Sequence, residues 1–461
     1  GFALLGGEPV WNSGGSLKGI ARLPATQRQP RRDVSFVTSG LFRDLYENLL
    51  VWLDRAVLLA LDASSNTIRR QHPELIPALD AALERSALPP SPGDEPLDVN
   101  HVAAHWVETV RGEGDEDVRA GRRASLRVFG NAPGGYGAGI NRLAERSGAW
   151  NARSELARVY LRRMGHAFGE GLQGEPAQTS FENQLKRTGR TFLGRASNLY
   201  GVLDNNDGYD YLGGLGLAIE SVRGNAPRAR VVRHADPKNP KVEPLEAALL
   251  SELRGRHLNP TSLKSLMEHG YAGARSMSQG FVENLWGWQV TSPQIIKSWA
   301  WDEIHSVFLE DRYAIGLDEF LEDGRNVHVL TNLEAILLVA ASKGFWQPNS
   351  ETLQALAESF AEHVAEHGLP GSGHTRPDHP MMSFVSTRLS EPLRERLSRR
   401  LTDAQVPKPG SDSSPSRITE IEIESTSDGP SLFVVIALAL VLVIAGANRG
   451  RRVEKAGAAR G

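Results

Sequence analysis

The sequence contains no cysteine in 461 residues. This absence excludes disulfides, thiolate nucleophiles and thiolate metal sites, and it leaves His, Asp, Glu and main-chain oxygen as possible ligands. A GxxxxGK[ST] phosphate loop is also missing, because the glycine-rich runs PGGYGAG and GGLGLA lack the lysine and serine that grip phosphates and magnesium. If the chemistry needs ATP, another polypeptide must hydrolyse it.

Clustered positive charge is lacking as well. The net charge is −3 with mixed signs, which argues against nucleic acid as a partner, since duplex binding needs a basic face. The composition is otherwise ordinary for globular protein, with 40% hydrophobic and 23% charged residues. A chain of this length has room for two or three domains with proper cores.

Glycine is concentrated at residues 127–139, where RVFGNAPGGYGAG places five glycines and a proline around Tyr136. Such a segment brings backbone close to a ligand or forms a plain turn. Other distinctive segments accompany it. They are SGLFRDL (39–45), LDNNDGYDYLGG (203–214), LNPTSLKSLMEHGYAGA (258–274), WGWQVTSPQIIKSWAWDE (286–303) and ASKGFW (341–346).

In this order and spacing, the segments resemble the C-terminal third of large tetrapyrrole-chelatase subunits, the family of the cobaltochelatase CobN subunit and the H-type subunit of magnesium chelatase. The resemblance runs from about Ala3 to about Leu389. Members of this family are much longer, so we interpret the chain as a fragment.

The pattern predicts a predominantly α fold with some β (α+β). Residues 1–98 would complete an upstream domain, and 99–390 would form the chelatase C-terminal region. Helices are predicted at residues 41–64, 99–112, 154–165, 179–196, 244–255, 260–269, 293–311, 330–343 and 351–367, with a strand at 229–234.

The C-terminal part changes character. Residues 391–430 read as a charged helix and a disordered linker, and 431–448 as a transmembrane helix before a basic tail at 449–461. The sixteen apolar residues at 432–447 span roughly 24 Å as a helix, and the alternative is a buried core helix. Because the positive flank follows this run, the positive-inside rule places the body outside the cytoplasm, which conflicts with cytoplasmic ATPase partners.

Metal insertion into a tetrapyrrole requires groups that take up pyrrole protons and hold a metal weakly, and carboxylates and imidazoles suit both tasks. Asp204 and Asp207, with Asp210 beside them, are the first candidates, and a solvated turn is the alternative. His269 is predicted as a proton acceptor or metal ligand, or else as a helix C-cap. Glu303 completes the predicted catalytic set.

The predicted metal ligands are His234, His269 and His305. Macrocycle contacts are predicted from aromatic rings and one cation, and simple core packing is the alternative for the tryptophans. The residues concerned are Arg43, Tyr136, Tyr209, Trp299 and Trp301. The run 366–380 also carries His367, His374 and His379 at metal-like spacing, which we interpret as a flexible loop that could bind metal adventitiously.

The resemblance implies that the chain is a fragment of the substrate-binding subunit of an ATP-dependent cobaltochelatase. Such an enzyme inserts Co²⁺ into hydrogenobyrinic acid a,c-diamide, with AAA+ ATPase subunits as partners. Mg²⁺ or Fe²⁺ is the alternative metal. Two other functions stay open: an exported, membrane-anchored dechelatase that removes metal from a tetrapyrrole such as haem, and a membrane-tethered tetrapyrrole-binding protein without catalysis.

Overall fold

Helices dominate the architecture of this computed structural model, which describes residues 5–10, 16–22, 36–38, 128–169, 172–195, 201–233 and 241–405. The α-helices are α7 (Ile140–Glu145), α8 (Arg153–Met164), α9 (Gln178–Arg187), α10 (Gly214–Arg223), α11 (Leu245–Glu252), α12 (Pro260–Met267), α13 (Gly270–Met277), α14 (Glu283–Thr291), α15 (Ser298–Phe308), α16 (Leu317–Glu322), α17 (Val327–Ser342), α18 (Ser350–His367), α19 (Pro380–Ser386) and α20 (Glu391–Asp403). Shorter helical segments are η3 (Ser147–Ala149), η4 (Gly208–Gly213), η5 (Leu253–His257), η6 (Ser278–Val282), η7 (Gly324–Asn326) and η8 (Gly373–Thr375).

The strands form small sheets. Strands β1 (Leu5–Val10) and β2 (Ser16–Arg22) pair antiparallel. A four-stranded sheet has the order β3-β4-β5-β6, with β3 parallel to β4 and the other pairs antiparallel. A three-stranded sheet has the order β7-β8-β9, with β7 parallel to β8. The remaining bounds are β3 (Phe36–Thr38), β4 (Val128–Gly130), β5 (His166–Gly169), β6 (Leu172–Pro176), β7 (Arg190–Arg195), β8 (Arg228–Arg233) and β9 (Lys241–Pro244).

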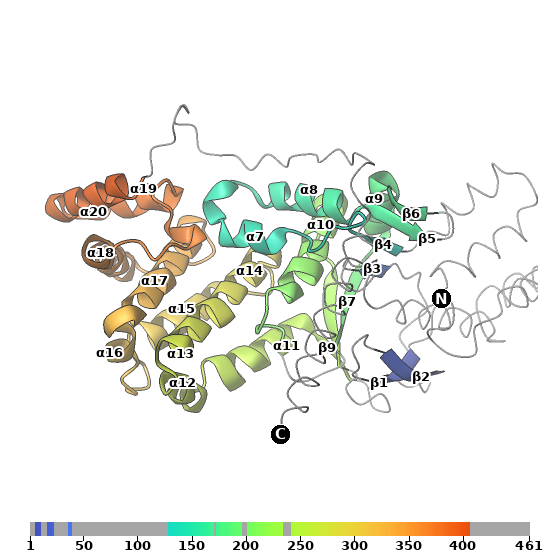
Figure 1. Ribbon diagram of the computed structural model, residues 1–461, viewed down its shortest axis with the longest axis horizontal. Coiled ribbons are helices and arrows are strands. Elements are labelled where there is room, and N and C mark those ends of the chain that lie inside the picture. Colours follow the sequence, from blue (N-terminus) through green and yellow to red (C-terminus); the bar gives the residue numbers. More distant parts are fainter. Residues whose placement is uncertain are drawn as a thin grey trace, which may run out of the picture. The chain divides into compact units, whose positions relative to one another are not determined.

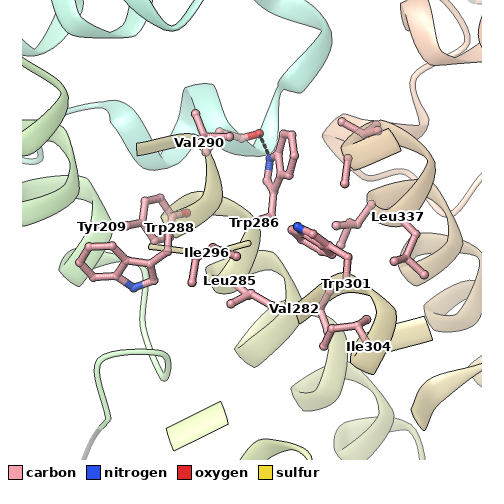
Figure 2. Packing of buried hydrophobic residues seen from close by; sticks show 14 of the residues in the cluster. Tyr209, Val282, Leu285, Trp286, Trp288, Val290, Ile296, Trp301, Ile304 and Leu337 are labelled. Atoms are coloured by element: carbon pink, nitrogen blue, oxygen red, sulfur yellow. Dashed lines mark hydrogen bonds between the residues drawn. The ribbon is translucent and has the colours of Figure 1, made fainter. Parts of the chain in front are cut away.

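Helices α14 and α17 form the centre of the core. In α14 every residue after Glu283 is buried, and α17 is buried along almost its whole length. Helices that are buried all round have no polar face, so both lie inside a layer of other helices. Figure 1 shows α14 among α7, α10, α13 and α15. Figure 2 shows the rings of Trp286, Trp288 and Trp301 packed among aliphatic side chains of this core.

The coarse fold prediction is confirmed, because the structure is helix-rich with small sheets. The helices predicted at 154–165, 330–343 and 351–367 match α8, α17 and α18, and the predicted strand at 229–234 matches β8.

Three predicted helix boundaries were wrong. The helix expected over 179–196 ends at Arg187, and the following residues form β7, because Arg190 to Arg195 pair in register with β8. The helix expected over 293–311 begins only at Ser298, after a turn at the proline. The helix expected over 260–269 ends at Met267, so His269 precedes α13 instead of closing α12.

Several predictions lie outside the described residues. They concern the helices at 41–64 and 99–112, the linker after residue 405, and the apolar run at 432–447. Among the residues that the structure does describe, no helix is both long and apolar enough to cross a membrane.

Candidate functional site

The glycine-rich segment is held in place by the carboxylate of Asp210. This side chain is 1% exposed and accepts main-chain hydrogen bonds from Ala138 (2.8 Å), Ile140 (2.6 Å) and Asn141 (3.0 Å). Burial raises the pKa of the Asp210 carboxyl, and the three main-chain bonds oppose that rise. These hydrogen bonds therefore fix the position of the segment 131–139, which connects β4 to α7.

Tyr136 is the exposed aromatic residue of this segment. Its ring is 50% exposed, and its main-chain oxygen accepts a hydrogen bond from the Arg163 guanidinium at 3.1 Å. The next residue, Gly137, has a positive φ of 76° and donates its N–H to the Tyr211 hydroxyl. An exposed aromatic ring on a fixed backbone suits contact with a flat ligand, so Tyr136 stays a predicted macrocycle contact.

The Asp204 side chain closes a turn. It accepts a hydrogen bond from the Gly201 main chain and forms an ion pair with Arg256, and its Oδ1 atom is 3.2 Å from His257 Nε2. Burial, followed by the charge of Arg256, lowers the pKa of His257 to about 4. Because the Asp204 oxygens already have these partners, the structure favours a structural role over the predicted catalytic one.

A buried chain of hydrogen bonds joins Glu283 to the segment after α18. The His374 Nε2 atom is 2.7 Å from Glu283 Oε1, and its Nδ1 atom is 2.7 Å from Ser147 Oγ. Ser147 Oγ is also 2.8 Å from His379 Nε2. Ser147 and His374 are fully buried, and His379 is 4% exposed.

Glu145 is the last residue of α7 and precedes Ser147 of this chain by two positions. Its carboxylate is hydrogen-bonded to the Asn206 side chain and interacts electrostatically with Glu283 and His374. Burial raises the pKa of Glu145, the Glu283 charge raises it further, and His374, Asn206 and Arg142 oppose the rise. Gly373 packs directly on the Glu145 main chain, with no room for a Cβ atom.

The Glu145–Glu283 pair joins four segments that are far apart in the sequence. It is contributed by α7 and α14, contacted by Asn206 from the 201–207 turn, and backed by His374 from η8. The Tyr209 hydroxyl also interacts with both carboxylates, and it has no hydrogen-bond partner among the described residues. A half-buried carboxylate such as Glu145 can take up and release protons.

Two predicted macrocycle contacts were wrong in this arrangement. Trp301 and Tyr209 are fully buried, so neither ring can stack on a ligand. Trp301 donates its indole N–H to Gln289 at 2.7 Å, and Tyr209 packs edge-on against Trp288. For these residues the core alternative is the better one.

Other predicted residues lie apart from the Glu145–Glu283 pair. Trp299 is half-buried beneath the Arg254 guanidinium, which also forms an ion pair with Glu303 at 3.0 Å. His305 packs against Trp346 and is 3.4 Å from Glu310. Asp207 and His269 are exposed.

The predicted metal ligands do not gather in the described structure. Within these residues, no group of three or more His, Asp or Glu side chains could hold a metal ion. His374 and His379 are buried partners of Ser147, so the prediction of a flexible metal-binding loop was wrong for both. Arg43 and His234 lie outside the described residues.

Sequence reasoning missed Glu145, Ser147 and Glu283 as members of one cluster. Glu145 and Glu283 are 138 positions apart, by subtraction of their numbers, and neither lies in a motif with a chemical signature. The spacing of His374 and His379 was a usable signal, but its meaning depended on Ser147.

Known proteins are similar in sequence to most of this chain. The model of the family described as CobN/Magnesium Chelatase matches residues 1–353. The chain is 30% identical to the aerobic cobaltochelatase subunit CobN of Pseudomonas aeruginosa, over 77% of the chain and 26% of that protein. It is 29% identical to the H-type subunit of magnesium chelatase from Cereibacter sphaeroides, over 77% of the chain and 26% of that protein.

A solved structure agrees with these relatives. The catalytic subunit of cobaltochelatase from Mycobacterium tuberculosis matches with a TM-score of 0.58 and 26% identity, covering 78% of this chain and 28% of that one. The chain thus spans about a quarter of the length of the curated relatives that it matches. On the extent of the family match, the chain belongs to the CobN/magnesium chelatase family.

Proposed function

We propose that this chain is part of the substrate-binding subunit of a tetrapyrrole metal chelatase, and that the reaction is insertion of Co²⁺ into hydrogenobyrinic acid a,c-diamide. The observation that carries the proposal is the match of the CobN/magnesium chelatase family model over residues 1–353. Glu283 and the half-buried Glu145 supply carboxylates for the removal of two pyrrole protons, which insertion of a divalent metal requires. Family membership supports the class of reaction, and the similarity to the Pseudomonas aeruginosa CobN subunit supports cobalt.

The identity of the metal is a more specific proposal than the class of reaction. Similarity to the magnesium-chelatase relative is nearly as high, so Mg²⁺ is the main competitor, with Fe²⁺ as another. Insertion by this family member would use ATP hydrolysed by AAA+ partner subunits, because the sequence has no phosphate loop of its own.

Macrocycle contacts in this proposal come from Tyr136, Trp299 and, outside the described residues, Arg43. His269, Asp207 and Glu303 are proposed to act in metal delivery, together with His305 and, outside the described residues, His234. Asp207 is next to Asn206 in sequence, and the Asn206 side chain interacts with Glu145, so the 201–207 turn brings Asp207, alone of this set, near Glu145.

A second candidate function is removal of metal from a tetrapyrrole by a membrane-anchored, exported protein. The observation that favours it is the apolar run at 432–447 followed by Arg449, Arg451 and Arg452. A membrane-tethered carrier without catalysis would share this topology.

The test is an assay of the intact subunit with its ATPase partners, with Co²⁺, Mg²⁺ and Fe²⁺ supplied separately to hydrogenobyrinic acid a,c-diamide and to protoporphyrin. We expect ATP-dependent insertion of Co²⁺ into the corrinoid. Release of metal from a metallated macrocycle without ATP would favour the dechelatase, and binding without either reaction would favour the carrier.

A further inference from the structure

The main chain at Tyr136 and Gly137 is held by hydrogen bonds from three directions. The Arg163 guanidinium, from α8, donates through Nη2 to the main-chain oxygens of Tyr136 and Gly137, each at 3.1 Å. The Asn131 side-chain amide donates to the same Gly137 oxygen at 2.8 Å. The Gly137 N–H donates to the Tyr211 hydroxyl, from η4, at 3.0 Å. Both peptide groups that flank this position are therefore bonded to other elements.

The residues that hold this loop are themselves anchored. The Tyr160 hydroxyl, which is fully buried on α8, donates to the Tyr211 main-chain oxygen at 3.1 Å. Asp210, the neighbour of Tyr211, binds the main chain of the residues that follow the loop. Helix α8 packs against α7 and α10 (Figure 1). The loop thus inherits its position from the helical core.

The backbone of the loop also requires glycine. Gly134, Gly137 and Gly139 have φ angles of 76°, 76° and 85°, in the left-handed region where a Cβ atom is unfavourable. A Cβ atom at Gly137 would meet only Asp210 Oδ2, at 3.6 Å, which is an ordinary contact distance. Substitution of Gly137 therefore acts through the backbone conformation and not through a clash.

The Tyr136 side chain contrasts with its main chain, because its ring is 50% exposed. Surface loops are ordinarily mobile, and ordering them on binding costs free energy. A ring that stands on an already ordered backbone avoids that cost, which is the arrangement expected of a preorganised binding element.

We propose that residues 134–139 form a preformed platform on which the Tyr136 ring stacks against the flat face of the macrocycle, and that Arg163 and Tyr211 are positioning residues that hold this ring before the ligand binds. This inference deepens the proposed function and rests on it. The loop conformation then affects affinity only through the Tyr136 ring. The effects of changing the loop and of removing the ring must therefore not add.

The experiment titrates the intact subunit with hydrogenobyrinic acid a,c-diamide. Tyr136→Ala should weaken binding about tenfold, and Gly137→Ala about fivefold, because alanine disfavours the left-handed backbone. In the Tyr136→Ala background, Gly137→Ala should weaken binding by less than about twofold more. Gly224→Ala is the matched control, with a φ of 84° and open space around it at the end of α10, and should leave affinity unchanged.

Two further variants test the positioning residues. Arg163→Ala removes a donor to both main-chain oxygens, and Tyr211→Phe removes the acceptor of the Gly137 N–H, so each should weaken binding about fivefold. Arg158→Ala, at an exposed residue of the same helix, and Tyr271→Phe, at an exposed ring of α13, are the controls and should leave affinity unchanged. If Gly137→Ala does not fold, Tyr211→Phe, which removes a single hydroxyl, takes its place in the double variant.

A measurement without ligand separates positioning of the ring from general stability. With 3-fluorotyrosine incorporated at position 136, the fluorine NMR spectrum of the subunit alone should show one narrow resonance. Gly137→Ala, Arg163→Ala and Tyr211→Phe should broaden or split that resonance. A role in stability alone would lower the melting temperature of these variants and leave the resonance as it is.

Full additivity of Gly137→Ala and Tyr136→Ala would overturn the platform, and so would a fluorine resonance that none of the three variants changes. If the wild-type subunit bound neither hydrogenobyrinic acid a,c-diamide nor protoporphyrin, the proposed function would be wrong, and the stacking role with it. In that case the fluorine spectra would still decide whether Arg163 and Tyr211 hold the ring.

Discussion

Asp210 accepts a hydrogen bond of 2.6 Å from the Ile140 main-chain N–H, and this contact joins the start of α7 to η4 across seventy residues of sequence. Three main-chain donors converge on this one buried carboxylate. An ionised side chain in this position satisfies donors that would otherwise be buried without a partner. The position of the start of α7, and through it that of Glu145, thus depends on Asp210.

Asp210→Asn should destabilise the protein by about 2 kcal/mol, because the amide can accept from only part of the donor set and turns its own N–H groups toward the rest. The measurement is urea unfolding at neutral pH. Asp207→Asn, three residues away and exposed, should change stability by less than about 0.5 kcal/mol. Equal losses in the two variants would contradict the role given to Asp210.

The indole of Trp301 supports a second prediction. Trp301→Phe should cost about 1–3 kcal/mol of stability, because the buried Gln289 Oε1 loses its donor. Macrocycle affinity should stay at the wild-type value, since the ring is fully buried. Trp299→Phe is the comparison at a half-buried ring, and a loss of macrocycle affinity specific to Trp301→Phe would restore the stacking role.

Acid should destabilise the protein through two buried histidines. The pKa is lowered to about 4 in His257 and to about 3 in His379, mainly by burial. Both values lie below the ordinary value of 6.5, so the unfolded chain binds more protons than the folded one below about pH 6.5. Above that pH neither ring is protonated in either state. On acidification to pH 5 each ring lowers the free energy of unfolding by about 2 kcal/mol, because only the unfolded state binds the proton.

The check is urea unfolding at pH 7 and pH 5 for the wild type and His257→Gln. The variant should lose less stability between the two pH values, because one of the two proton-linked groups is gone. His367→Gln, at a more exposed ring, should retain the wild-type difference. A wild type equally stable at both pH values would show that these histidines are protonated in the folded state.

Membrane attachment can be tested on the apolar run at 432–447, which lies outside the described residues. We expect the 461-residue chain to sediment with membranes and to need detergent for extraction, because no charge interrupts the run. Truncation before Ser431 should release it to the soluble fraction. Recovery of the untruncated chain in the supernatant at low salt would contradict the anchor.

Sequence patterns predicted the helices that have a clear apolar stripe or defined ends, such as α8 and α18. They failed at Arg190 to Arg195, where pairing with β8 outweighs the continuation of a helix. For the site, the sequence indicated that carboxylates and imidazoles take part. It did not indicate which of these residues contact one another. His374 becomes a buried hydrogen-bond partner only because Ser147, more than two hundred residues earlier, lies against it. Contacts of this kind depend on tertiary packing, which no local spacing encodes.

His269 provides the final prediction, because its position separates function from folding. The residue is exposed, precedes α13 and makes no side-chain capping bond, so His269→Asn should change stability by less than about 0.5 kcal/mol. If His269 delivers the metal, the same variant should lower metal insertion about a hundredfold and leave macrocycle binding unchanged. Glu268→Gln, at the neighbouring exposed residue, is the control for surface charge. Insertion at the wild-type rate by His269→Asn would remove this residue from the metal path and leave Asp207 and Glu303 as the next candidates on the surface of the described chain.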